Sequence, residues 1–220
     1  MSHSWYCGAV LPGPEWESRP VPVEETDFHG LLAGLRCTDA PTGQTSIIMA
    51  CLAMYCRMQR VVEIGVYKGG TAVLLAHALR QTGGSYVGVD ISECWEARDR
   101  LIKHGLTAWF IATMDSKAYA KSGYDEKPID LLFIDGDHTM EGCLNDWLLW
   151  TPFVRPGGYV FIDNSLSELG VRQALEIILS TTQVRVEWSH ILIQQSFGTA
   201  MFKRRFPDEM ERLKKGEWDK

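Results

Sequence analysis

The chain has 220 residues, of which 45% are hydrophobic and 23% are charged, and 28 acidic against 22 basic residues give it a formal net charge of -6. This composition is that of a soluble globular domain and argues against collagen-like repeats, coiled coils and extended disorder. The acidic balance also argues against a nucleic acid or an anionic membrane as the partner.

The first 43 residues show little hydrophobic periodicity and carry four prolines within the first 22 positions. This pattern predicts an irregular arm or lid with one short helix at 28–35. A basic region followed by an apolar one, the mark of a secretory signal, is not seen in this arm. The six cysteines include no CxxC pair, so we expect a reduced, cytoplasmic protein.

A domain over residues 44–206 is predicted from alternating strand-like and helical patterns. An apolar helix at 46–58 comes first. Strands are then expected at 60–64, 85–89, 106–111, 129–134 and 158–162. The helices between and after them are expected at 70–81, 93–104, 139–150 and 167–180. Near-continuous apolar strands separated by helices indicate a parallel sheet covered on both faces, an α/β fold of the Rossmann-like kind.

The pattern of alternating strands and helices changes after the last of these helices. Val184, Val186 and Trp188 alternate with polar residues, and a second strand-like run follows at 198–203. Two strands so close in the chain pair antiparallel, which predicts a C-terminal hairpin with His190 in its turn. Residues 207–220 are mostly charged and are expected to form a fraying tail.

Glycines follow the first predicted strand, where Glu63 leads into Gly65, Gly69 and Gly70 before Thr71. Ligands of open parallel sheets bind at the carboxyl ends of strands. Glycines there let the backbone approach a ligand, and the N–H groups of a helix start attract anions. The spacing GxxxGG differs from the GxGxxG of dinucleotide enzymes. Taken alone, this turn is better explained by a tight strand-to-helix connection.

Asp90 ends the second predicted strand. An acid at this place can accept both hydroxyls of a ribose. It can also cap the helix that begins near Glu93. Together with the glycine turn, the ribose interpretation is favoured.

Two further strand ends carry oxygen ligands. Asp135 and His138 follow the strand at 129–134, and Asp163 and Asn164 follow the strand at 158–162. Adjacent parallel strands would bring these oxygens together, and Mg²⁺ prefers such ligands. Either aspartate by itself would more simply be a helix cap.

Four segments carry a resemblance to a known family: 61–71 (VVEIGVYKGGT), 87–90 (VGVD), 131–138 (LLFIDGDH) and 155–164 (RPGGYVFIDN). Over about 44–204 the chain resembles the class I S-adenosylmethionine-dependent methyltransferases. Within them it is similar to the metal-dependent O-methyltransferases, which include catechol O-methyltransferase and the macrocin-type macrolide-sugar enzymes. The resemblance implies a methyltransferase sheet of five parallel strands with a C-terminal antiparallel hairpin.

The resemblance implies where the cofactor binds. By position, Gly65 and Tyr67 would line the methionine part of S-adenosylmethionine. Thr71 and the helix start would hold the carboxylate of the methionine, and Glu63 would support its amino group.

The same resemblance implies that Asp90 would hold the ribose and that Asp115 would lie near the adenine. The alternative for Asp115 is a helix N-cap.

The resemblance also implies the reacting site. Asp135, Asp163 and Asn164 match the three metal ligands of the catechol enzymes. His138 lies where catechol enzymes carry a general-base lysine and the macrolide-sugar enzymes carry a histidine. Asp135 and His138 are therefore the expected catalytic residues, with Mg²⁺ orienting two vicinal oxygens of the acceptor.

The predicted function is a Mg-dependent O-methyltransferase acting on a small hydroxylated molecule, catechol-like or a sugar diol, as in natural product biosynthesis. An NAD-linked oxidoreductase shares the strand, the glycine turn and the distal acid, but hydride transfer does not need the acid cluster. A non-catalytic ligand-binding member of the fold is the other alternative. The apolar arm leaves a homo-oligomer open.

Overall fold

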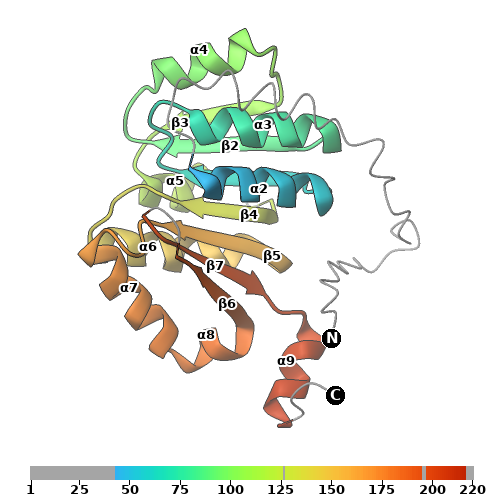
Figure 1. Ribbon diagram of the computed structural model, residues 1–220, viewed down its shortest axis with the longest axis vertical. Helices are drawn as coiled ribbons and strands as arrows, with labels where there is room; N and C mark the ends of the chain where they lie inside the picture. The colour runs from blue at the N-terminus through green and yellow to red at the C-terminus, as the bar shows by residue number, and fades with distance from the viewer. Residues whose placement is uncertain (1–42, 126, 195–196, 217–220) are drawn as a thin grey trace.

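A seven-stranded sheet in the order β3-β2-β1-β4-β5-β7-β6 runs through the computed structural model, which describes residues 43–125, 127–194 and 197–216 (Figure 1). Its strands are β1 Arg60–Ile64, β2 Ser85–Asp90, β3 Trp109–Thr113, β4 Ile129–Ile134, β5 Val154–Asp163, β6 Trp188–Ile193 and β7 Thr199–Arg204. Strands β1 to β5 pair in parallel, and β7 pairs antiparallel with both β5 and β6. The predicted parallel sheet with a terminal antiparallel pair is confirmed.

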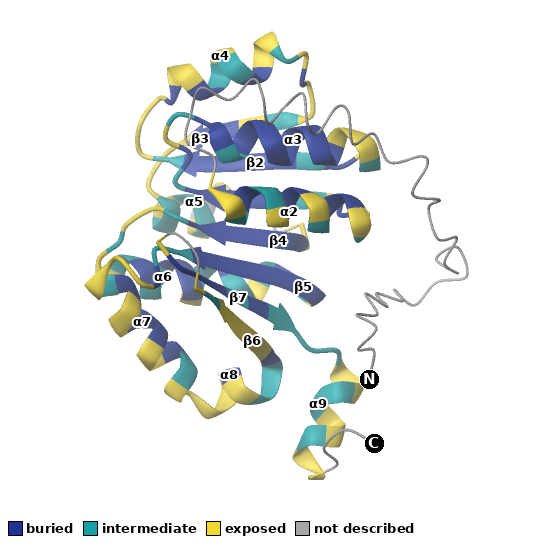
Figure 2. Ribbon diagram, viewed as in Figure 1, coloured by how far each residue is buried: buried dark blue, intermediate teal, exposed yellow. Residues whose placement is uncertain are grey.

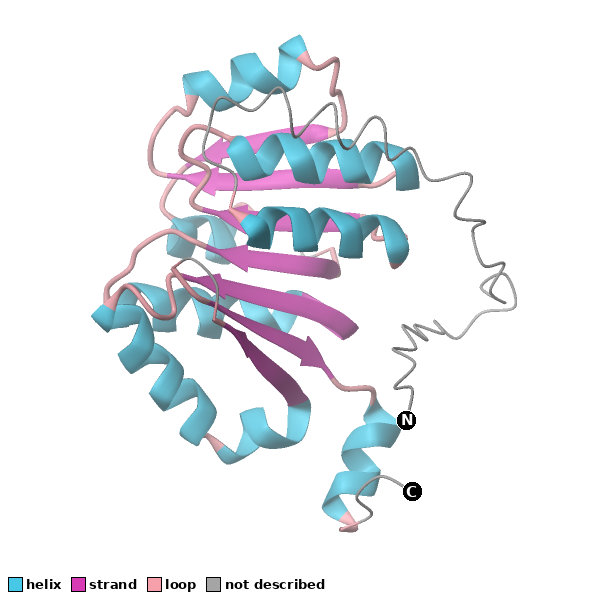
Figure 3. Cartoon of the chain, viewed as in Figure 1, coloured by secondary structure: helices cyan, strands magenta, loops and turns pink. Residues whose placement is uncertain are grey.

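Helices cover both faces of this sheet (Figure 3). They are α2 Gln44–Tyr55, α3 Gly70–Thr82, α4 Trp95–Lys103, α5 Ser116–Ser122, α6 Met140–Trp150, α7 Leu169–Ser180, α8 Thr182–Glu187 and α9 Pro207–Lys214, with a 3₁₀ turn, η2, at Thr151–Phe153. Helices α2, α3 and α4 contribute to one hydrophobic core, and α6 and α7 contribute to the other. The two hydrophobic cores lie on opposite faces of the sheet, and both include side chains of its strands.

The central parallel strands are mostly apolar because both of their faces are buried. Val61 belongs to the core under α2 and α3, and its neighbour Val62 belongs to the core under α6 and α7; neither is exposed. Figure 2 shows strands β2, β4 and β5 as a largely buried layer between the helices. Burial of each such side chain contributes about 1.5–3 kcal/mol, so the two cores hold the sheet from both sides.

The strand order reverses beside β1. Strand β1 lies between β2, which follows it in the chain, and β4, which comes two strands later. The peptide N–H of Asp135, just past β4, donates to the carbonyl of Ile64 at the end of β1 over 2.8 Å. A crevice for ligands forms at such a reversal, outside the carboxyl ends of the strands. The fold therefore places the loops after β1, β2, β4 and β5 around one opening.

The prediction of a strand around Val184 and Val186 is wrong. Residues 182–187 form α8, and β6 begins only at Trp188. The guanidinium of Arg205 donates to the carbonyls of Arg185, Val186 and Trp188. A cation at a helix C-terminus satisfies carbonyls that lack partners in the helix, and this distant contact stabilises a helix where the alternation favours a strand.

Other expectations are also corrected. Residues 207–214 form α9 in place of a fraying tail; it begins with a proline, and the N–H of Phe206 donates to Glu209 Oε2 over 2.7 Å. His190 lies within β6 and not in a turn. Cys56 is disulfide-bonded, so the expectation of fully reduced cysteines does not hold for it.

The predicted arm, its short helix and its role as a lid lie outside the described residues. Among the residues that are described, no helix combines the length and the apolar character that a membrane span requires.

Candidate active site

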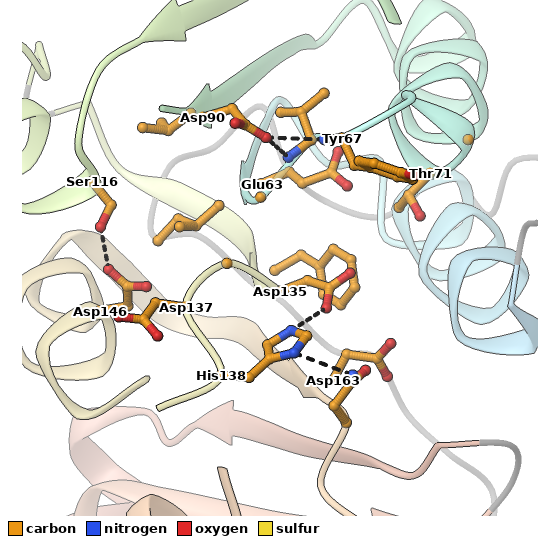
Figure 4. A pocket seen from close by; sticks show the side chains of 18 of the residues that line it. Glu63, Tyr67, Thr71, Asp90, Ser116, Asp135, Asp137, His138, Asp146 and Asp163 are labelled. Carbon is orange, nitrogen blue, oxygen red and sulfur yellow. Dashed lines mark hydrogen bonds and ion pairs between the residues drawn. The ribbon is translucent and has the colours of Figure 1, made fainter. Parts of the chain in front are cut away.

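One cavity of about 1140 Å³ lies at the carboxyl ends of β1, β2, β4 and β5 (Figure 4). It is lined by all ten residues that the sequence predicts for the site: Glu63, Gly65, Tyr67, Thr71, Asp90, Asp115, Asp135, His138, Asp163 and Asn164. Segments separated by up to a hundred positions thus meet in one place. The prediction that the strand ends share a site agrees with this placement.

The turn after β1 requires glycine. Gly65 has a φ of 88°, and a Cβ added to it would lie 2.1 Å from the carbonyl oxygen of Asp135. Gly69 has a φ of 77°, and its added Cβ would lie 2.5 Å from the Cβ of Ala97. Tyr67 is held between them at a φ of 49°, which non-glycine residues seldom adopt, with its side chain 71% exposed. The turn presents backbone and one tyrosine ring to the cavity.

Two helices begin at the cavity without side-chain caps. Helix α2 begins after Gly43 and α3 after Gly69, and within the described part of the chain neither N-cap residue has a side chain that could accept a hydrogen bond from the helix start. Ser46 and Thr71 join the two starts through a hydrogen bond of 2.8 Å between their hydroxyls. Free N–H groups at a helix N-terminus attract anions. The pair is suited to a carboxylate, and sequence reasoning found only the α3 half of it.

The carboxylate of Asp90 is fully occupied within the protein. Its Oδ2 accepts the N–H groups of Val66 and Tyr67 at 2.9 and 3.0 Å, and its Oδ1 accepts the N–H and hydroxyl of Ser92 at 2.8 and 2.6 Å. Burial raises the pKa of Asp90, but these hydrogen bonds outweigh burial and lower it. Asp90 therefore holds the glycine turn in shape. A ribose hydroxyl at this place has to share or replace the contacts of Ser92.

Glu63 is a buried acid in the floor of the cavity. It is 2% exposed, and the hydroxyl of Tyr86 donates to its Oε2. Burial raises the pKa of Glu63 well above its usual range; the hydrogen bond from Tyr86 opposes this, and the charges of Asp135 and Asp90 add to it. A cationic ligand group beside Glu63 would favour the ionised form.

His138 connects two of the strand ends. Its Nε2 lies 3.2 Å from Asp135 Oδ1, and its Nδ1 lies 3.5 Å from Asn164 Nδ2. With the hydrogen on Nε2, the ring donates to Asp135 and accepts from Asn164. The hydrogen bond to Asp135 raises the pKa of His138, although burial acts in the opposite direction. The imidazole is thus held between the residues that follow β4 and β5.

Asp163 completes this cluster. Its Oδ1 accepts a hydrogen bond of 2.6 Å from the hydroxyl of Thr199. Burial raises the pKa of Asp163; the bond from Thr199 lowers it and the charge of Asp135 raises it. Asn164 follows at a φ of 59°, a left-handed conformation that asparagine tolerates.

The donor chemistry of Asp135, Asp163 and Asn164, two carboxylates and an amide oxygen, fits a hard cation. Within the described part of the chain, no three residues of the histidine, cysteine, aspartate or glutamate types are grouped as a metal would require.

The far wall of the cavity contains an acid that sequence reasoning missed. Asp115 caps α5, since its Oδ1 accepts the N–H of Ala118 at 3.0 Å. Behind it, Asp146 of α6 is 3% exposed and accepts a hydrogen bond of 2.5 Å from the hydroxyl of Ser116. Burial raises the pKa of Asp146 to about 6. The only signal in the sequence is an acid beside Trp147 on the inner face of α6.

The central segment of the chain is similar to known proteins. Residues 62–165 match the family model described as a methyltransferase domain. A curated protein of Acanthamoeba polyphaga mimivirus is 28% identical over 113 residues, which are 47% of this chain and 50% of that protein. The match thus spans half the length of that relative.

Solved structures share the fold. Cofactor-bound Rv0187 from MTB superposes with a TM-score of 0.66 at 21% identity, covering 81% of this chain and 91% of that one. The O-methyltransferase from Bacillus cereus in complex with SAH has a TM-score of 0.64 at 18% identity, covering 82% and 92%. The O-methyltransferase TomG from Streptomyces achromogenes, in complex with SAM, has a TM-score of 0.62 at 18% identity with the same coverage.

Proposed function

We propose that this chain, which carries a class I methyltransferase domain, transfers the methyl group of S-adenosylmethionine to a hydroxyl of a small molecule. The observation that carries the proposal is that two kinds of binding feature line the same cavity. The cavity joins a glycine turn and two uncapped helix starts at one end to a histidine held by two oxygen-bearing strand ends at the other. Cofactor and acceptor would meet between these ends.

The cavity suits S-adenosylmethionine chemically. Its carboxylate would lie at the starts of α2 and α3, near Ser46 and Thr71, where free N–H groups favour an anion. Its amino group would lie toward Glu63, whose ionised form a cation stabilises. At about 1140 Å³, the cavity has room for a cofactor and a small acceptor together. In the O-methyltransferases from Bacillus cereus and Streptomyces achromogenes named above, SAH and SAM are bound on the same fold.

A divalent cation, Mg²⁺ by preference, would be held by Asp135, Asp163 and Asn164. When bound, it would lower the pKa of an acceptor hydroxyl and orient a second oxygen beside it. The mutual charge of Asp135 and Asp163, which raises the pKa of Asp163, supports this assignment, because a cation between the two would relieve it. An acceptor with two vicinal oxygens, a catechol-like or sugar diol of a natural product, fits such a site.

His138 would remove the proton from the acceptor hydroxyl. Its ring nitrogens face Asp135 and Asn164, so the imidazole lies where the acceptor oxygen would be held. Asp135 fixes the orientation of the ring and favours the protonated form that results. The base would therefore be both positioned and stabilised by the same carboxylate.

The alternatives have weaker support. An NAD-linked oxidoreductase needs the glycine turn but has no use for Asp163 and Asn164 beside a histidine. A ligand-binding protein without activity has no need of His138. A cytoplasmic location and a homo-oligomeric state remain predictions, as does the absence of nucleic acid and membrane partners.

The experiment begins with calorimetric titration of the full chain with S-adenosylhomocysteine and with NAD. We expect binding of the first and none of the second; tight binding of NAD alone would overturn the proposal. Turnover with S-adenosylmethionine is then followed on a panel of catechols and vicinal diols with Mg²⁺. Activity should disappear with EDTA and return with added Mg²⁺. Turnover that survives EDTA after thorough dialysis would remove the metal from the mechanism and leave methyl transfer standing.

A further inference from the structure

Strand β7 holds the part of the chain that carries two of the proposed cation ligands, Asp163 and Asn164. Thr199, the first residue of β7, lies directly opposite Asp163 in the antiparallel pairing with β5 and donates a hydrogen bond of 2.6 Å to its Oδ1. On the other side of Asn164, the N–H of Ser165 donates to the carbonyl of Gly198 over 3.0 Å. Two consecutive residues of one strand thus fix the chain before and after Asn164, whose φ of 59° lies in the left-handed region.

Thr199 can orient a carboxylate because it is itself fixed. It is 1% exposed, and β7 is paired on both sides, with β5 and with β6. Its hydroxyl also lies 2.7 Å from that of Thr45 in the first turn of α2. A hydroxyl has one hydrogen and an ionised carboxylate only accepts, so Thr199 donates to Asp163 and accepts from Thr45. The hydrogen bonds therefore run in one direction, from Thr45 through Thr199 to Asp163.

Asp163 shares its cavity with a second carboxylate. Asp163 and Asp135 both line the cavity, and Figure 4 shows both beside the ring of His138. Like charges repel, so their mutual interaction does not keep the two carboxylates turned toward a common ligand. Burial raises the pKa of Asp163, and the hydrogen bond from Thr199 is the largest effect that opposes burial and favours the ionised form. Thr199 thus acts on the charge of this carboxylate as well as on its orientation.

We propose, resting on the function proposed above, that Thr199 is a positioning residue for the cation. Its hydroxyl, fixed by Thr45, holds the carboxylate of Asp163 in the orientation in which it binds the cation together with Asp135 and Asn164. Loss of a hydrogen-bond partner that orients a metal ligand typically lowers metal affinity by about 10- to 100-fold. Thr45 acts one hydrogen bond further away, so its loss should weaken cation binding less than the loss of Thr199.

The test measures cation binding directly, without turnover. Mn²⁺, which takes the same kinds of oxygen ligand as Mg²⁺, is titrated into the full chain, and the free ion is measured by electron paramagnetic resonance. Thr199→Val should raise the dissociation constant for Mn²⁺ by about 10- to 100-fold. Thr199→Ser keeps the hydroxyl and should stay close to the wild type. Affinity for S-adenosylhomocysteine, measured by calorimetry, should stay near that of the wild type in both variants, because the proposed cofactor contacts lie elsewhere, at Ser46, Thr71 and Glu63.

Two further variants complete the design. Thr45→Val gives a result even if Thr199→Val fails to fold, and its dissociation constant for Mn²⁺ should lie above that of the wild type and below that of Thr199→Val. Thr82→Val is the matched control. The hydroxyl of Thr82 also donates within the fold, to the carbonyl of Met58 over 2.6 Å, but Thr82 is the last residue of α3, at the end of the helix away from the cavity. Its loss should leave the affinity for Mn²⁺ unchanged.

The outcomes separate this inference from the proposed function. Unchanged Mn²⁺ affinity in both Thr199→Val and Thr45→Val would overturn the inference and leave methyl transfer standing. A loss in Thr199→Ser as large as that in Thr199→Val would do the same, because packing and not the hydroxyl would then be responsible. A wild-type chain that binds S-adenosylhomocysteine but no Mn²⁺ would overturn the inference together with the role of the cation. Failure to bind S-adenosylhomocysteine would overturn the proposed function itself.

Discussion

Thr199 on β7 donates a hydrogen bond of 2.6 Å to Asp163 at the end of the neighbouring strand β5. Thr199 is 1% exposed, and its hydroxyl also lies 2.7 Å from that of Thr45 in the first turn of α2. The antiparallel strand thus orients a carboxylate that belongs to the parallel part of the sheet. It also connects that carboxylate to the helix start at which the cofactor is proposed to bind.

Replacing Thr199 tests this contact. Thr199→Val keeps the shape of the side chain but removes one donor from the half-buried carboxylate of Asp163, which costs about 1–3 kcal/mol of unfolding free energy. Thr199→Ser retains the hydroxyl and should cost less. Both are measured by denaturant titration at pH 7. Equal stabilities of the two variants would show that the hydrogen bond contributes nothing and that packing alone matters.

Sequence patterns predict those elements of the fold whose conformation follows from the burial of their own residues. The strands at 60–64 and 129–134 are found at the predicted bounds because they are apolar on both faces. The residues at their carboxyl ends, Glu63 and Asp135, then follow from the geometry of a parallel sheet. Once the strands of a parallel sheet have been predicted, the site residues at their carboxyl ends can therefore be predicted as well.

The parts that sequence patterns miss depend on distant partners. Helix α8 is stabilised by Arg205, which lies eighteen or more positions beyond it in the chain. Asp146 of α6 accepts its hydrogen bond from Ser116, the first residue of another helix, α5. The direction in which a side chain points is equally hidden: Asp90 ends its strand as expected, but it turns toward the backbone of the glycine turn. No local pattern encodes these pairings.

Gly65 and Gly83 form a matched pair for testing the glycine turn. Both have positive φ angles, 88° and 75°, but an added Cβ meets the carbonyl of Asp135 only at Gly65 and meets nothing within 4 Å at Gly83. Gly83→Ala should cost about 1 kcal/mol, since the strain is confined to the backbone. Gly65→Ala should cost several times as much and should abolish binding of S-adenosylhomocysteine, because the backbone must move. Thermal unfolding and calorimetry measure the two effects, and similar losses for both variants would contradict the close approach.

His138→Ala tests the general base. We expect kcat to fall by about 10²-fold or more, and the low-pH limb of the kcat/KM profile, which reports deprotonation of the base, should disappear. Affinity for S-adenosylhomocysteine should stay near that of the wild type, which separates loss of a base from loss of the site. His190→Ala, at an exposed position of β6, is the control. A loss well below 10²-fold with an unchanged pH profile would assign His138 a structural or substrate-binding role.

Asp146 also gives the stability of the protein a defined pH dependence. Its pKa is about 6 in the folded chain, against about 3.9 for an unperturbed aspartate. Between these values the folded state binds more protons than the unfolded state, so the contribution of Asp146 to stability falls as the pH rises from about 4 to about 6. Above pH 6 the loss is complete and constant, on the order of 3 kcal/mol. Asp146→Asn cannot ionise and escapes this loss.

The unfolding free energies of the wild type and of Asp146→Asn are therefore compared by denaturant titration between pH 4 and pH 8. The difference in favour of the variant should grow up to about pH 6 and then level off. Other groups with a raised pKa, His138 and Asp163 among them, are common to both proteins and largely cancel in the difference. Asp99→Asn, at an exposed position of α4 away from the cavity, is the control and should run parallel to the wild type. A difference that does not change with pH would mean that Asp146 titrates near its ordinary pKa and that water or another donor already satisfies it.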